Sequence, residues 1–96
     1  MARYRIVHWR EIPSLVEAIE GDQVARVPLS QRFQDLIDIE AMRQGASDTD
    51  AYLDGWGQSA ELERPGSPEE VAGQVAAKLE AEFHDVIARR VSPYRR

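Results

Sequence analysis

The sequence predicts an α+β fold: a small antiparallel sheet of three to four strands, with two main helices packed on one face. Short segments rich in β-branched and aromatic residues occupy the first third of the chain, and two longer segments with apolar residues at helical spacing follow. We expect the order β-β-β-α-short α-β-α. The chain has 96 residues, the size of one domain with a thin core, so residues 1–96 are treated as a single domain.

The first strand is predicted over residues 3–9, and Glu11-Ile12-Pro13 should end it. Alternation places its side chains on two faces, with Tyr4, Ile6 and His8 on one and Val7 and Trp9 on the other. Residues 14–20 fit either a short helix after Pro13 or a strand that forms a hairpin with residues 24–27. We choose the hairpin, because the segment is short for a helix and a glycine-containing turn leads directly into the partner strand.

The first main helix is predicted from Ser30, a residue type that caps helices, to about Gln44, and Gly45 should end it. Its apolar stripe consists of Phe33, Leu36, Ile37 and Ala41. A short helical turn should follow, capped by Ser47 or Asp48. Residues 58–63 alternate between apolar and polar types and suit a last edge strand.

The last helix has the clearest local signal. Ser67-Pro68-Glu69-Glu70 is a capping box, with an N-cap serine, a proline at the first helical position and a glutamate at the third. An apolar stripe continues behind it, made of Val71, Val75, Leu79, Phe83 and Val86. We therefore expect one continuous helix that runs to about Arg90 and buries this stripe in the core.

Composition excludes several classes of protein. The chain has no cysteine, which removes disulfides, thiolate catalysis and zinc sites built on sulfur. It shows no signal peptide and no apolar run of the roughly 18 residues that a membrane span needs, so we expect a cytoplasmic protein without a membrane partner. The net charge is −5, and all the carboxylates lie between Glu11 and Asp85, whereas the ends are basic, including a tail over about residues 89–96. Such an acidic body disfavours nucleic acid as a partner.

The sequence contains no catalytic constellation. No serine or threonine is set beside a base, and no glycine-rich loop is long enough to hold a phosphate, so we predict no enzyme, no catalytic residue and no cofactor. Glu80 and His84 are four residues apart on the predicted helix, as two metal ligands would be. A metal site needs at least three ligands, and since no third is evident we predict none.

Surface recognition remains as the most available activity. Tryptophan dominates the energetics of many protein interfaces, and the chain has two, Trp9 and Trp56. Ile39 and Met42 lie beside the apolar stripe of the first main helix and widen it beyond what a thin core requires. Gly55 and Gly57 leave Trp56 few neighbouring side chains. Trp56, Trp9, Ile39 and Met42 are therefore the candidate partner-binding residues.

One part of the chain resembles the ribbon–helix–helix DNA-binding fold. The segments are Val24–Ser30, then Phe33, Ile37-Asp38 and Ala41, then Gly45–Asp50, which look like its strand, first helix and capped second helix. The resemblance implies a dimeric DNA-binding regulator, which we keep as the alternative function. It departs from that family because Gly55 and Gly57 interrupt the second helix and because the strand offers mainly Arg26 to DNA.

A second resemblance covers nearly the whole chain. The segments are Arg3–Pro13, Leu29–Gln34, Ala41–Gly45, Asp50–Leu53 and Gly66–Ala72. Together they resemble the small bacterial "virulence factor" domain family, whose stand-alone members tend to be encoded beside enzymes of tetrahydrofolate- and corrinoid-dependent methyl transfer. The resemblance implies a non-catalytic accessory protein of one-carbon metabolism that binds another protein. The identity of that protein, any ligand and the oligomeric state stay open, as does the role of the basic tail.

Overall fold

The computed structural model describes the chain except for residues 46–48 and 92–96. Five antiparallel strands form one sheet in the order β3-β2-β1-β4, and β5 pairs with the other end of β1. Their bounds are β1 (Ala2–Trp9), β2 (Ile12–Glu20), β3 (Gln23–Pro28), β4 (Trp56–Gln58) and β5 (Leu62–Arg64). The predicted α+β class is confirmed, with one more short strand than the largest number expected.

The β2–β3 hairpin over residues 12–28 confirms the choice of strand for residues 14–20. The first strand ends at Trp9, as predicted, but Ile12 and Pro13 do not belong to the break, because β2 already begins at Ile12. The chain reverses in two residues, and Arg10 takes a left-handed φ of 53°, where glycine would be usual. The tight turn thereby sets Trp9 opposite Ile12.

The edge strand expected over residues 58–63 is instead two short strands, β4 and β5. Ser59 separates them and takes over the local pairing with β1. The backbone N–H of Ser59 donates to the Ile6 carbonyl at 2.9 Å, and the Ile6 N–H donates to the Ser59 hydroxyl oxygen at 2.8 Å. One side chain therefore replaces a backbone partner where the edge strand breaks.

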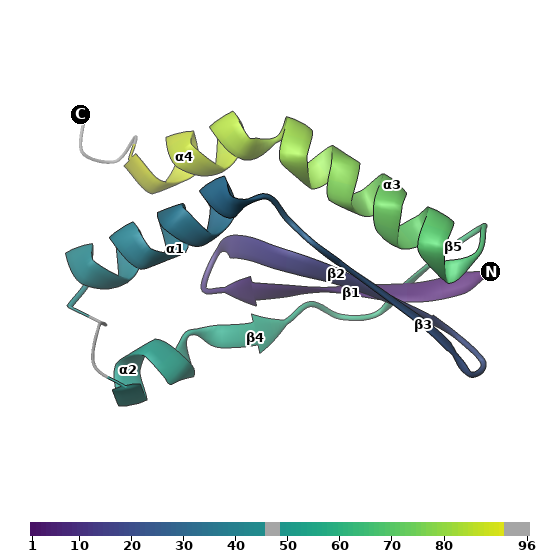
Figure 1. Ribbon diagram of the computed structural model, residues 1–96. Helices are drawn as coiled ribbons and strands as arrows, with labels where there is room; N and C mark the ends of the chain where they lie inside the picture. The colour runs from purple at the N-terminus through teal and green to yellow at the C-terminus, as the bar shows by residue number, and fades with distance from the viewer. Residues whose placement is uncertain (46–48, 92–96) are drawn as a thin grey trace.

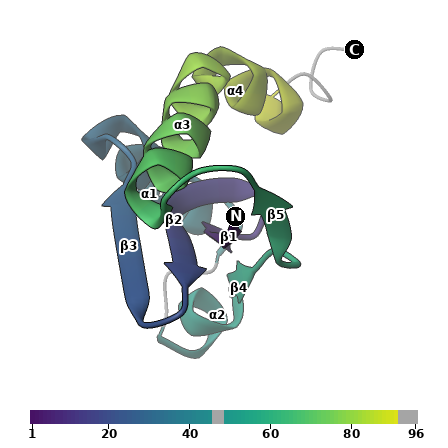
Figure 2. The ribbon, with the colours of Figure 1, turned by 90° about the vertical axis from the view of Figure 1, so that its right-hand side faces the viewer.

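Four helices accompany the sheet: α1 (Gln31–Arg43), α2 (Thr49–Asp54), α3 (Pro68–Ala81) and α4 (Phe83–Val91). Helices α1 and α3 lie on one face of the sheet, whereas α2 lies on the other side beside β4 (Figure 1 and Figure 2). Each of these described helices is too short or too polar to cross a bilayer.

The ends of α1 match the prediction except for the hydrogen bonding of the N-cap residue, Ser30. Gly45 ends the helix region with a left-handed φ of 69°, as expected. Ser30 occupies the N-cap position, but its side chain makes no cap hydrogen bond. Its backbone N–H and hydroxyl instead donate to the Glu80 carboxylate at 2.6 and 2.8 Å. The start of α1 is therefore fastened to the end of α3. Ser47 and Asp48 lie outside the described residues.

The predicted last helix is divided into α3 and α4 at Glu82. Its capping box is confirmed in both directions, with the Glu70 N–H donating to Ser67 at 3.2 Å and the Ser67 N–H donating to Glu70 at 3.0 Å. The apolar stripe crosses the break. Val71, Val75 and Val86 are buried, while Leu79 and Phe83 are half-buried.

The core has two parts. Under α3, small residues of the sheet and of the helix pack together, namely Ala2, Val16, Ala18, Val71, Ala72, Val75 and Ala76. At the β1–β2 turn the second part is built from larger side chains, namely Trp9, Ile12, Phe33, Ile37, Ala41 and Val86. Phe83 joins it through an edge contact with Phe33, at 4.9 Å between ring centroids. The second part therefore depends on the wrapping of α1, α2 and α4 around one end of the sheet.

Candidate functional site

Trp9 is a core residue, which corrects its prediction as a partner-binding residue. Its side chain is 0% exposed, and its indole N–H donates to the Tyr52 carbonyl at 2.8 Å. The Tyr52 ring is stacked on it at 5.8 Å between centroids. With its surface covered and its polar atom paired inside the molecule, Trp9 is not available to a partner.

The glycines on either side of Trp56 lie against side chains of β1. A Cβ at Gly55 would lie 2.6 Å from Cε2 of Trp9, and one at Gly57 would lie 3.2 Å from Cε1 of His8. The two glycines therefore make room for Trp9 and His8. Their role therefore differs from the predicted one, which was to leave Trp56 with few neighbouring side chains.

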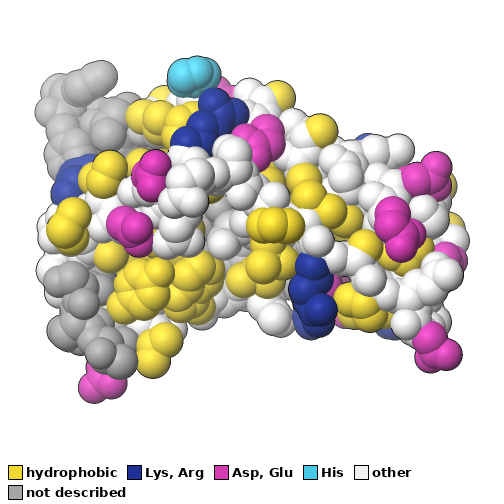
Figure 3. All heavy atoms as spheres, in the orientation of Figure 1, with side chains coloured by type: hydrophobic (Ala, Val, Ile, Leu, Met, Phe, Trp, Pro, Cys, Tyr) yellow, Lys and Arg dark blue, Asp and Glu magenta, His cyan; other side chains and the backbone are white. Residues whose placement is uncertain are grey.

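Trp56 is half-buried and lines a shallow hollow. Its ring meets Tyr52 edge to face, at 6.0 Å between centroids. Together with Val7, Gly57 and Gln58 it borders a hollow of about 470 Å³. On the face shown in Figure 3, hydrophobic side chains gather over the region where α2 and β4 lie, and a basic side chain lies beyond them. Trp56 is thus partly accessible beside other apolar side chains.

Ile39 and Met42 are exposed, at 50% and 66%, on the side of α1 turned away from its buried residues. The hydrophobic cluster that includes Trp56 contains neither of them. The structure therefore gives no single patch that unites the four candidates: Trp9 is core, Trp56 borders the hollow, and Ile39 and Met42 belong to a different surface.

The face of the sheet turned away from α3, here called the outer face, was not identified from the sequence. Strand pairing places on it Arg3, Arg5, Val7, Leu15, Glu17, Ile19, Val24 and Arg26. The uncovered face of an antiparallel sheet is usually polar. Here Val24 is 46% exposed and the other three apolar residues are only partly covered. The outer face therefore combines apolar and charged side chains.

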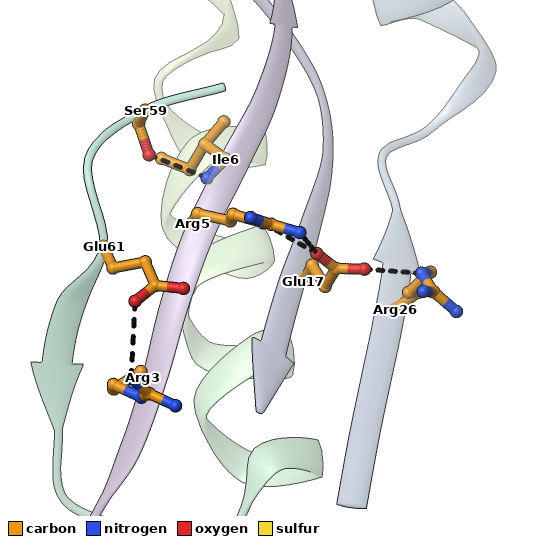
Figure 4. Close-up of polar contacts among 7 residues, drawn as sticks. All are labelled: Arg3, Arg5, Ile6, Glu17, Arg26, Ser59 and Glu61. Atoms are coloured by element: carbon orange, nitrogen blue, oxygen red, sulfur yellow. Dashed lines mark hydrogen bonds and ion pairs between the residues drawn. The ribbon is translucent and has the colours of Figure 1, made fainter. Parts of the chain in front are cut away.

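A row of three charged residues crosses the middle of the outer face. The Glu17 carboxylate is flanked by Arg5 at 2.6 Å and Arg26 at 2.7 Å, one from each neighbouring strand (Figure 4). Glu17 is nearly buried, at 7% side-chain exposure, whereas Arg26 is 65% exposed. One carboxylate thus holds two guanidinium groups, and the row carries a surplus positive charge on an acidic protein. Alternation could have revealed it, since Leu15, Glu17 and Ile19 share a strand face.

The pKa of Glu17 is lowered, chiefly by the hydrogen bond from Arg5 and against the opposing effect of burial, with Arg26 adding to the lowering. A carboxyl with a lowered folded-state pKa stabilises the fold above its unfolded pKa of about 4.3, and the stabilisation is lost as pH falls through the folded pKa. We expect Glu17→Gln to cost about 1–2 kcal/mol at pH 7. Thermal unfolding from pH 7 to pH 3 should show the difference from wild type shrinking below about pH 4.

The matched control is Glu69→Gln, an exposed carboxyl in the first turn of α3. It should leave the pH profile of the melting temperature close to that of wild type. A constant difference between Glu17→Gln and wild type across the whole pH range would contradict the role of the Glu17 charge.

The Glu80 and His84 pair is not arranged as metal ligands. The Glu80 carboxylate accepts hydrogen bonds from Ser30 and from Arg32, the latter at 3.1 Å. Burial raises the pKa of Glu80, but these hydrogen bonds outweigh it and the pKa is lowered. The helix breaks at Glu82, between the two residues, so they do not share one regular helix face. Among the described residues, no group of three potential ligands could hold a metal ion.

The comparisons with known proteins agree with the resemblance found in the sequence. The family described as Virulence factor matches over residues 7–90, from within β1 to within α4. No curated protein and no solved structure matches the chain. The matched range covers Trp56, the junction of α3 with α4, and Glu17 and Arg26 of the charged row, whereas Arg5 precedes it. Because the match extends over most of its length, the chain belongs to the Virulence factor family.

Proposed function

We propose that this chain is a non-catalytic accessory protein that binds another protein through the outer face of its sheet and the hollow beside Trp56. The observation that carries the proposal is the composition of that face, where apolar side chains surround a row with two arginines on one glutamate. Apolar side chains that gather on an exposed surface often mark a site of interaction with another protein.

The shape of the surface supports an apolar anchor from the partner. The hollow of about 470 Å³ is open and has Trp56 and Val7 as its apolar walls. Aromatic residues in such positions contribute a large share of binding energy. A leucine or an aromatic side chain of the partner would cover Trp56 and remove apolar area from water, which is favourable by about 25 cal/mol per Å².

The charges support an acidic group beside that anchor. Arg26 donates through Nε to the Glu17 carboxylate (Figure 4), and the Arg26 side chain is still 65% exposed to solvent. A carboxylate of the partner would meet Arg26 and balance the surplus charge of the row. The partner is therefore a protein with an acidic residue next to an apolar one. By the resemblance described above, an enzyme of tetrahydrofolate- or corrinoid-dependent methyl transfer is the first partner to test.

The test is capture of the partner from native cytosol, followed by affinity measurements with the purified partner. Trp56→Ala should weaken binding by about 2 kcal/mol, or roughly 30-fold, and Arg26→Glu should weaken it and reverse its salt dependence. Met42→Ala and Ile39→Ala are matched controls on the exposed side of α1, and they should bind as wild type does.

Three results would contradict the proposal. Unchanged affinity in stable Trp56→Ala and Arg26→Glu variants would exclude the outer face. A loss confined to the Met42 and Ile39 variants would move the interface to α1. If the purified chain turned over a methyl-transfer substrate without the partner, it would be an enzyme and not an accessory protein.

The alternative of a ribbon–helix–helix regulator loses its structural support. In that fold the strand pairs with a second copy and a long second helix follows the turn, whereas here β3 pairs with β2 of the same chain and α2 has six residues. β3 offers a single basic side chain, Arg26, to DNA phosphates. We therefore favour a protein partner over DNA, and duplex DNA titrated at low and high salt should show no salt-dependent binding.

A further inference from the structure

A separate pocket lies where α3 meets α4, on the opposite side of the sheet from the outer face. It has a volume of about 240 Å³ and is bordered by β1, the start of β2, the helix junction and Ser59. Binding sites for drug-sized molecules range from about 300 to 1,000 Å³. The pocket therefore suits a small molecule and is too small for a nucleotide or another large cofactor.

Its walls are apolar on two sides. Ile6 and Pro13 come from the sheet, and Leu79 and Val86 come from the two helices. Glu82 sits between these helices: it follows the last residue of α3, and its carbonyl accepts the first hydrogen bond of α4, from the Val86 N–H at 3.1 Å. The break in the predicted helix thus places one carboxylate beside an apolar pocket.

His8 contributes an unusual buried atom. Its Nδ1 is inaccessible and, among the described residues, has no hydrogen-bond partner, an arrangement that is rare in native proteins. A Cβ at Gly57 would lie 3.2 Å from Cε1 of this ring, so the glycine leaves room for it. The pocket therefore has the His8 ring on its sheet side.

Among the described residues, the charges that line the pocket add up to a negative one. Arg10 and Glu11 border it with opposite charges. The Arg10 guanidinium lies 4.9 Å from the centroid of the Trp9 ring and donates to Gln44. The Glu82 carboxylate has no ion pair or side-chain hydrogen bond within the described part of the chain. A carboxylate without a partner beside an apolar cavity attracts a cation.

We propose that this pocket binds a small organic cation, with its ammonium group at the Glu82 carboxylate and its apolar body between Leu79, Val86 and Ile6. The His8 ring contacts that body from the sheet side. The inference is independent of the proposed protein partner, because the pocket and the outer face lie on opposite sides of the sheet.

The test is an NMR titration of the full chain with 2-phenylethylamine. The backbone amides of His8, Ser59 and Leu79 should shift and saturate. The isosteric alcohol 2-phenylethanol should bind about fivefold more weakly or worse, and phenylacetate should not bind. Glu82→Gln should weaken binding of the amine by about fivefold or more, as expected for the loss of one charged contact. Glu69→Gln, on the first turn of α3, should leave it unchanged.

Each contrary result would overturn the inference. Equal saturable shifts with phenylacetate, shifts that never saturate, or unchanged binding in Glu82→Gln would each exclude a cation site. Glu82→Lys provides a second variant, whose added positive charge should abolish binding while the remaining amide spectrum shows an intact fold. Retained binding in Glu82→Lys would place the amine elsewhere.

Discussion

Replacing Gly55 by alanine is expected to destabilise the protein by about 3 kcal/mol or more, although the change adds a single methyl group. The added Cβ would lie 2.6 Å from Cε2 of Trp9 and closer still to its Nε1. The indole cannot move away, because it is fully buried and its N–H is bonded to the Tyr52 carbonyl. Either the ring or the turn that joins α2 to β4 must shift.

The measurement is urea unfolding, with Gly73→Ala as the matched control. Gly73 lies on the exposed side of α3, and nothing is within 4 Å of a Cβ placed there. Alanine at that position should stabilise the protein by about 0.5–1 kcal/mol through helix propensity. Similar unfolding midpoints for the two variants would show that Trp9 does not pack against Gly55.

Trp9→Ala is expected to have the other large effect, a loss of about 3–5 kcal/mol. The substitution empties the centre of the second core part, where α1, α2 and α4 meet the end of the sheet. It also leaves the Tyr52 carbonyl without its donor. For a domain of this size the loss approaches the whole free energy of unfolding, so the variant should be largely unfolded at 37 °C.

Trp9→Phe separates packing from hydrogen bonding. It keeps an aromatic ring but removes the donor to Tyr52, and it should cost less than Trp9→Ala. Trp56→Ala should cost less again, because Trp56 is only half-buried. If Trp56→Ala unfolded the protein while Trp9→Ala left it stable, the roles assigned to the two tryptophans would be reversed.

The two substitutions should be strongly non-additive. In a Trp9→Ala background the methyl group at Gly55 no longer meets the indole, so its cost should fall toward zero. Additive losses in the double variant would show that the clash is with another group. A double-mutant cycle thus tests the Gly55–Trp9 contact independently of either single value.

Features that depend on neighbouring residues could be predicted from the sequence. The capping box at Ser67 joins residues three apart, and the β2–β3 hairpin depends on alternation around one turn, so both were predicted. Gly45 at the end of α1 belongs to the same class. The likeness to the Virulence factor family, which rests on the order of such local segments, was also visible before the structure.

Features that depend on distant segments were decided by the tertiary structure. Trp9 looked like an exposed anchor because nothing near it in sequence shows that Tyr52 and Gly55 cover it. The Ser30 hydroxyl binds Glu80, fifty residues away, in place of its own helix. The free energy that favours a residue type locally is small, and a hydrogen bond to a charged group contributes more.

The candidate sites follow the same division. Alternation identifies which residues of β2 share a face, but only strand pairing brings Arg5 and Arg26 to the two sides of Glu17. In the sequence, the apolar stripe of the last helix is continuous from Val71 to Val86. The residues around Glu82 keep the helical spacing, so nothing in the sequence indicates the break there. The bend beside Glu82 lies where the chain passes from α3, which packs mainly on β2 and β3, to α4, whose Phe83 contacts Phe33 of α1. Contacts of this kind, between distant segments, are visible only in the tertiary structure.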